Sequence, residues 1–359
     1  KYWLGDSAGT PPPTTATDAL WFSTLQTENP ADMFCYDQDG NLYILWRDNL
    51  NNCKVRRFEL KAGGTYDKNT AATPDQNLDL NVPFFSNADC VIAVDISDGK
   101  KYLYYVDTAS TPAVKRFEWD PLFGAGSQDA AYSISIPAGE KVTALAANKD
   151  GLFVGARTMS ISPAGYTLSV KKYDKQDGAD KGTIDVGSFQ KTPTEPTSPP
   201  FDPYTKTIAF VNDLQVLDGV LYAVTSKEEY GMKKTSFNYK ADTFKNSGKL
   251  YKIGSTKDGF PGSAVELAKK DPVGTAGNEV GYGFYRFIAV KYDEAERIRL
   301  IIASDGAWGK EGLASFPDRP YCKNADKVLE YDLKGRLQAE RDSGGGFSKL
   351  LQESGFEWN

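Results

Sequence analysis

The sequence contains no histidine among its 359 residues. This absence excludes Ser-His-Asp and Cys-His catalysis, histidine-ligated zinc or iron sites, and histidine-based pH switches. Carboxylate, lysine and tyrosine chemistry needs no imidazole, and neither does an oxygen-ligated calcium site. Excess positive charge is also lacking, because 42 lysines and arginines stand against 48 aspartates and glutamates, a formal net charge of −6. Binding to nucleic acid needs clustered positive charge, so we expect no nucleic-acid partner.

Long hydrophobic runs are missing as well. The apolar stretches 287–290 and 300–303 are interrupted by charged residues well before the roughly 18 residues that a membrane-spanning helix requires. We therefore expect no transmembrane segment. The sequence starts at Lys1 rather than at a methionine, so we expect that an upstream segment has been removed, and a secretory signal is one candidate.

Cysteine is scarce, and the four cysteines form no C-x-x-C pair of the kind that suggests a zinc site or thioredoxin-like redox chemistry. Buried thiols are the favoured interpretation, because cysteine is among the most buried residue types. One disulfide is the alternative for an exported chain with an even number of cysteines, and its pairing does not follow from the sequence. The four residues are Cys35, Cys53, Cys90 and Cys322.

What the sequence does contain is a repeat with a long period. Five segments share an apolar first strand, a turn, a second strand with Leu-Tyr or its equivalent, and a third strand that reads Val-x-x-Phe or a close variant. The expected second strands are 41–46, 102–106, 151–155, 220–224 and 298–302; the third are 55–58, 114–117, 170–173, 250–253 and 328–331; the fourth are 77–82, 131–136, 183–186, 264–268 and 337–341. Four antiparallel strands in each repeat predict a propeller blade.

The Asp-Gly-x-Leu-Tyr turn followed by Val-x-x-Phe resembles the blade pattern of bacterial β-propellers of the six-bladed, NHL-like or YVTN-like kind, over residues 32–343. With blades of about 60 to 80 residues the repeat is longer than in the compact family forms, so no functional residue is carried over. We expect one all-β domain over residues 1–359, a β-propeller of six four-stranded blades. Residues 1–31 would complete the last blade together with the C-terminal end, and five blades is the alternative. The expected location is extracytoplasmic, in the bacterial periplasm or at the cell surface, free or anchored as a lipoprotein.

The segment 37–41, Asp-Gln-Asp-Gly-Asn, begins like an oxygen-rich calcium loop. A strand follows it, and the bidentate glutamate of an EF-hand is missing from the twelfth position. A hairpin turn is therefore the favoured interpretation. We expect no metal site and no cofactor, with calcium as the weaker alternative.

Two long excursions separate second and third strands, at residues 227–246 and 305–324. Long loops on a rigid scaffold are frequent recognition sites, and aromatic rings suit sugar rings or a protein partner. The alternative is that these rings pack over their own blades. The candidate ligand-binding residues are Tyr230, Phe237, Tyr239, Trp308, Phe316 and Tyr321.

These patterns favour a non-enzymatic binding module that recognises a glycan or a protein ligand through long loops on one rim. A carboxylate-based glycoside hydrolase or lyase acting in a central funnel is the alternative. Acidic residues are abundant, but no spacing among them separates a general acid from a nucleophile, so the catalytic residues of such an enzyme are unknown. A structural scaffold without a small ligand is the third possibility.

Overall fold

The computed structural model describes most of the repeat region of the chain. Every regular element in this part is a β-strand, apart from one short 3₁₀ helix at Phe123–Ala125. Among these residues no helix is long and apolar enough to cross a membrane. The described residues are 29–47, 52–60, 77–83, 91–108, 111–120, 122–161, 164–190, 204–235, 238–257, 260, 262–270, 285–292, 298–304 and 327–342.

The strands form four-stranded antiparallel sheets in which each strand pairs with its neighbours in sequence. Backbone contacts divide the chain into two compact units, and the border between them runs through the third sheet. The strands of the five sheets are β1 (Asn29–Tyr36), β2 (Leu42–Arg47), β3 (Asn52–Phe58) and β4 (Asn77–Pro83); β5 (Ile92–Asp95), β6 (Tyr102–Asp107), β7 (Ala113–Glu118) and β8 (Ser127–Ser135); β9 (Glu140–Asn148), β10 (Gly151–Ile161), β11 (Ala164–Tyr173) and β12 (Asp180–Gln190); β13 (Tyr204–Leu217), β14 (Val220–Thr235), β15 (Asn238–Ser255) and β16 (Val265–Lys270); and β17 (Tyr285–Tyr292), β18 (Ile298–Ser304), β19 (Lys327–Tyr331) and β20 (Leu337–Asp342).

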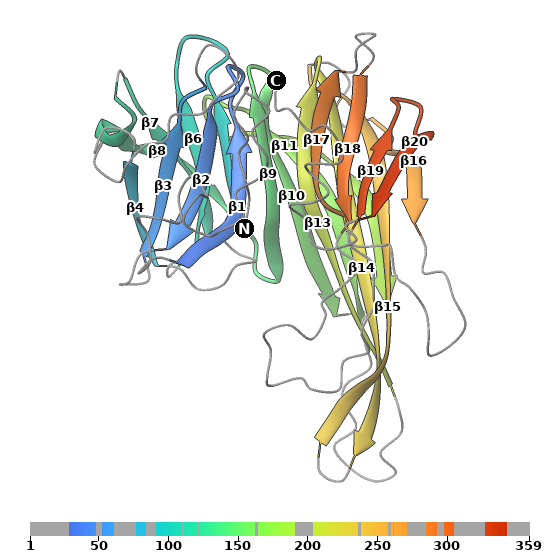
Figure 1. The fold of residues 1–359 in the computed structure, drawn as a ribbon. Helices are drawn as coiled ribbons and strands as arrows, with labels where there is room; N and C mark the ends of the chain where they lie inside the picture. The colour runs from blue at the N-terminus through green and yellow to red at the C-terminus, as the bar shows by residue number, and fades with distance from the viewer. Residues whose placement is uncertain are drawn as a thin grey trace. The chain divides into compact units, whose positions relative to one another are not determined.

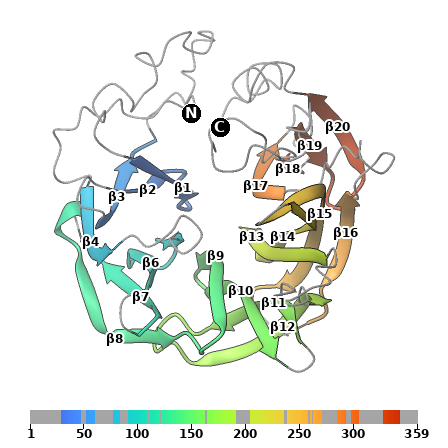
Figure 2. The ribbon, with the colours of Figure 1, turned by 90° about the horizontal axis from the view of Figure 1, so that it is seen from below.

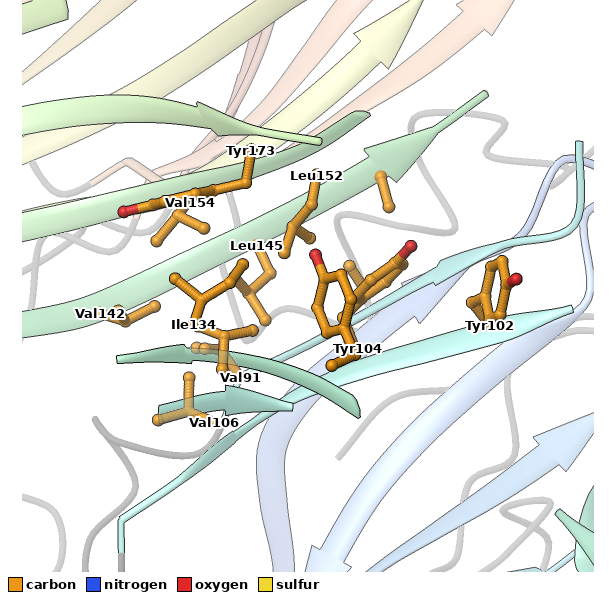
Figure 3. Close-up of a cluster of buried hydrophobic side chains, with 14 residues drawn as sticks. Val91, Tyr102, Tyr104, Val106, Ile134, Val142, Leu145, Leu152, Val154 and Tyr173 are labelled. Atoms are coloured by element: carbon orange, nitrogen blue, oxygen red, sulfur yellow. The ribbon is translucent and has the colours of Figure 1, made fainter. Parts of the chain in front are cut away.

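In the first unit the sheets pack face against face through two hydrophobic clusters. One cluster joins the first and second sheets and includes Tyr43, Trp119 and Phe123, whose rings meet at centroid distances of 5.1 to 6.1 Å. The other includes Tyr104 of β6 and Leu152 of β10 (Figure 3). All six residues of β6 are buried, because both faces of the second sheet are covered. Each fully buried large apolar side chain contributes roughly 1.5 to 3 kcal/mol to stability.

The second unit repeats this packing between the fourth and fifth sheets. Its core cluster combines Tyr222, Val224 and Leu250 of the fourth sheet with Leu300 and other residues of the fifth. Figure 2 shows β13 and β17, the first strands of these two sheets, on one side of the unit, and β16 and β20, the last strands, on the other. Successive four-stranded sheets that cover one another's faces are the blades of an all-β propeller fold.

The predicted strand order is confirmed in all five repeats, since every expected second, third and fourth strand overlaps an observed one. The expectation of six blades is not met by the described residues, which form five four-stranded sheets. Residues 1–28 and 343–359, which were expected to share the sixth, lie outside the described part of the chain. The extent of the expected single domain stays a prediction.

Two local predictions have clear outcomes. The Asp218-Gly219 pair of the Asp-Gly-x-Leu-Tyr pattern forms the expected turn, and its positive φ angles of 47° and 71° are those of a primed hairpin turn. Cys35 on β1 is a partly buried thiol and Cys53 on β3 is a buried one, as the favoured interpretation required. Cys90 and Cys322 lie outside the described residues.

Candidate functional site

The predicted ligand-binding residues fall on two segments of the second unit. Tyr230 lies on β14 and Tyr239 on β15, so both belong to one β-hairpin. Phe237 is outside the described residues. The other excursion, with Trp308, Phe316 and Tyr321, also lies outside them, so the prediction that both excursions share one rim stays a prediction.

The excursion at 227–246 is a hairpin extension of the fourth sheet. β14 and β15 pair from Val220 and Ser255 to Thr235 and Asn238, with two register shifts along the way, at Leu221/Tyr222 and at Gly231/Met232. The pairing of β13 with β14 ends at Met232, and β16 pairs with β15 only from Gly248 onward. Residues 227–232 of β14 therefore still have β13 beside them, and β14 and β15 pair only with each other at residues 233–235 and 238–240. We call residues 227–235 and 238–247 the ribbon. Figure 1 shows β14 and β15 continuing beyond the end of β16.

Two stacks of cations on aromatic rings lie next to the ribbon, between the third and fourth sheets. The guanidinium carbon of Arg157 on β10 lies 5.2 Å from the ring centroid of Tyr166 on β11 and 4.8 Å from that of Phe210 on β13. Lys227, the first residue of the ribbon, places its ammonium 5.6 Å from the ring centroid of Phe189 on β12. All five side chains are partly buried. We refer to these residues as the cation–aromatic stacks.

The two stacks start from neighbouring pairs of residues on β13 and β14. Lys227 pairs with Ala209, and Phe210 pairs with Ser226, so the two stacks begin on neighbouring residues of the same strands. Partly exposed rings beside fixed positive charges can bind a sugar ring through its apolar face and a carboxylate or hydroxyl through the cation. None of the five residues was predicted as a site residue, because the stacks bring together side chains from five strands, β10 to β14.

A second cluster of charges lies in the first unit, and it is buried. The Nζ atom of Lys175 lies 2.6 Å from Oδ2 of Asp95 and 2.7 Å from Oδ2 of Asp98. The Asp95 side chain is 0% exposed, and it also accepts hydrogen bonds from the backbone N–H and the hydroxyl of Ser97. The hydrogen bond from Lys175 lowers the pKa of Asp98 below its usual value. Burial alone would lower the pKa of Lys175, but its bonds to both aspartates outweigh burial and raise it.

Arg116 on β7 is held in a similar way. Its guanidinium carbon lies 4.2 Å from the ring centroids of both Tyr102 and Tyr132, and it donates hydrogen bonds to the carboxylate of Asp129 and the backbone carbonyl of Lys175. The bond from Arg116 lowers the pKa of Asp129. A general acid needs a raised carboxyl pKa and access to substrate. These carboxyl groups have lowered pKa values or no exposed surface, so this cluster holds the sheets together.

The segment 37–41 is the predicted hairpin turn. Oδ1 of Asp37 accepts the backbone N–H groups of Asp39 and Asn41, and Oδ2 accepts the side-chain amide of Asn41 and the hydroxyl of Tyr43. Gly40 has the positive φ of 80° that the turn requires. Each carboxylate oxygen of Asp37 thus accepts two hydrogen bonds within the turn. Within the described part of the chain, no group of three or more cysteine, aspartate or glutamate side chains is placed to hold a metal ion.

No family model matches the sequence, and no curated protein matches it. The narrower resemblance to NHL-like or YVTN-like propellers therefore stays a prediction. Among solved structures, the chain is similar to the α-L-arabinofuranosidase ARB93A from Fusarium graminearum (10% identity over 88% of this chain and 80% of that chain, TM-score 0.44). It is also similar to sucrose-6-phosphate hydrolase from Lactobacillus gasseri (13%, 86% and 60%, TM-score 0.42) and to AofleA from Arthrobotrys oligospora (8%, 88% and 86%, TM-score 0.35). At these levels of similarity, none of them assigns an activity to this chain.

Proposed function

We propose that the protein is a non-enzymatic binding module that recognises a glycan or protein ligand with the ribbon and the cation–aromatic stacks of its second unit. The observation that carries this proposal is the placement of three partly buried rings against two cations beside a strand pair that extends past the rest of its sheet. Recognition surfaces combine rigid aromatic area with a few fixed charges in this way. The expected extracytoplasmic location is part of the same proposal.

A carboxylate-based enzyme has less support among the described residues. Asp95 is fully buried, and Asp107 is paired with Lys115 at 2.5 Å. Asp213 accepts a hydrogen bond from the next backbone N–H, and Asp218 lies in the hairpin turn. Two catalytic carboxylates would have to face one cleft about 5 to 9.5 Å apart. Asp95 and Asp107 are instead engaged in ion pairs, Asp218 in a turn, and Asp213 in a local hydrogen bond with the backbone.

The proposal is tested on a glycan array and by affinity capture with defined candidate ligands, using wild-type protein and ring-removing variants. Phe189→Leu and Tyr166→Leu keep apolar volume but remove the flat ring face. Each variant is expected to weaken binding about tenfold, since an aromatic contact is worth about 1.5 kcal/mol. Tyr36→Leu, at a partly buried ring in the first unit, is the control and should bind as the wild type does. Equal losses in all three variants, or no ligand at all for the folded wild type, would contradict the proposal.

A further inference from the structure

The first sheet has two apolar faces, and they differ in how far they are covered. One face belongs to the cluster with Tyr43, Trp119 and Phe123, in which thirteen of the fifteen described members are buried. The other face holds a separate cluster, and only two of its six described members are buried. We call this the second face, and its residues are Phe34 and Tyr36 on β1, Leu42 and Ile44 on β2, Phe58 on β3, and Leu60.

The strand register explains why these side chains lie together. Phe34 pairs with Ile44, and Tyr36 pairs with Leu42. Leu42 pairs in turn with Phe58 on the next strand. Register partners share one face of a sheet, and successive residues alternate between the two faces. The rings of Phe34 and Tyr36 meet edge to face, with centroids 5.9 Å apart.

The composition of the second face is that of a covered surface. An antiparallel sheet with one face in water carries polar residues on that face, whereas the second face is apolar and includes two rings. In the second sheet both faces are covered, and every residue of β6 is buried. Among the described residues, the cluster on the second face contains none from another sheet. Partly exposed apolar clusters of this kind mark surfaces on which another chain segment or protein packs.

Residues 1–28 lead directly into β1 and include the apolar run Leu20-Trp21-Phe22. Phe34 lies level with Ile44, and Asn29 lies level with Arg47, so the two β1 residues are separated by three register positions, about 10 Å. With about 10 Å between packed layers, Phe22 would have to span about 14 Å from Asn29 to lie over Phe34. The seven residue steps from Phe22 to Asn29 can span up to about 23 Å. The run is therefore within reach of the second face.

A second aromatic run, Phe84-Phe85, follows the sheet but is too closely attached to its far end. It comes directly after Pro83 of β4, which pairs with Asn52 of β3. Ile44 lies level with Arg56, four positions from Asn52, or about 13 Å along the strands. It is also two strand spacings from β4, about 10 Å across the sheet. Two residues beyond Pro83 span only about 7 Å, so this run is too short to cover the second face.

We propose that the run Leu20-Trp21-Phe22 packs on the second face and covers it. Packing of these side chains removes apolar surface from water on both partners. The covalent link to β1 makes the contact intramolecular, so it is favoured over the binding of a separate chain at ordinary protein concentrations. The contact requires neither strand pairing nor the C-terminal end, unlike the shared blade expected from the sequence. A second copy of the chain on the same face is an alternative outcome of the test.

The test measures how fast iodoacetamide labels a thiol placed on the second face by Ile44→Cys, with the labelled position read by peptide mass spectrometry. Cys35 lies on the opposite face of the same sheet, so its labelling reports a general opening of the unit.

In this background, the cover variant is Leu20→Ser/Trp21→Ser/Phe22→Ser. The control, Phe347→Ser/Leu350→Ser/Leu351→Ser, makes a similar change near the C-terminal end. Circular dichroism confirms folding, and Phe22→Ser alone replaces the triple variant if the latter does not fold.

We expect the cover variant to be labelled at position 44 at least about tenfold faster than the Ile44→Cys protein, because a covered thiol reacts only when the segment opens locally. Labelling of Cys35 should stay the same, and the C-terminal control should remain protected at position 44. The inference is overturned if the cover variant and the Ile44→Cys protein react equally fast at this position, if Cys35 labelling accelerates in parallel, or if the control also loses protection. Protection that grows with protein concentration and persists in the cover variant would overturn it in favour of a second copy.

Discussion

Replacing Lys175 by methionine is the most direct test of what holds the first unit together. Lys175→Met keeps an apolar side chain of similar length but removes the ammonium between Asp95 and Asp98. Asp95, which is 0% exposed, would keep only its hydrogen bonds from Ser97. Breaking a buried ion pair from one side costs about 3 to 5 kcal/mol. That is a large share of the 5 to 15 kcal/mol by which native proteins are typically stable.

The contribution of Asp98 is much smaller, because its side chain is 36% exposed. We assign it less than about 1 kcal/mol, as for other solvent-exposed pairs. The exposed pair of Lys181 and Asp174, separated by 3.2 Å, provides a matched control. Lys181→Met should therefore change the free energy of unfolding by less than about 1 kcal/mol.

Urea unfolding followed by tryptophan fluorescence measures these differences. The double variant Lys175→Met/Asp95→Leu removes both charges, and it should recover most of the stability lost in Lys175→Met, because replacing a whole buried pair by apolar groups is often neutral. The reasoning is refuted if Lys175→Met stays within about 1 kcal/mol of the wild type, or if the double variant is no more stable than the single one.

Two further predictions concern the same unit. Tyr43→Phe should lower the free energy of unfolding by about 1 to 2 kcal/mol, because it removes the 2.9 Å hydrogen bond to Asp37. A urea midpoint equal to that of the wild type would contradict this. The free energy of unfolding should also decrease as the pH is lowered below about 4. Arg116 lowers the pKa of Asp129 in the folded state, so the unfolded chain binds this proton at a higher pH than the folded chain does. Asp129→Asn should show a shallower decrease in the urea midpoint between pH 6 and pH 3, and a parallel decrease would contradict the assignment.

The repeat could be found from the sequence because each blade is made of local pairings. The apolar run around Leu103 and the Val-x-x-Phe pattern that ends at Phe117 identify neighbouring strands, and the Asp-Gly turns between strands fix their order. Strand lengths were harder to predict. The third strand expected at 250–253 is β15, which runs from Asn238 to Ser255. Polar residues such as Lys245 and Asn246, which are not typical of strands, hid its first part in the sequence.

The sequence predicted one part of the candidate site, the excursion, but not the contacts between sheets. The excursion that carries Tyr230 and Tyr239 was found from the sequence, and its strand pairing shows that it extends the β14–β15 hairpin. The stack of Arg157 on Tyr166 and Phe210 depends on contacts between different sheets, and no local pattern encodes these. The same holds for Lys175 and Asp95, which are 80 residues apart.

Among the strands that the structure describes, hydrogen bonding joins only strands that follow one another in sequence. The backbone of one four-stranded sheet is thus a continuous stretch of chain that crosses no other. Duplicating or deleting such a stretch would leave the backbone hydrogen bonds of every other sheet intact. It would alter only the side-chain packing between the sheets next to the duplication or deletion. Whole four-stranded sheets can therefore be gained or lost during evolution without a change in the strand order of the remaining sheets. The connections between strands can lengthen independently of this, as the long β14–β15 hairpin of the fourth sheet illustrates.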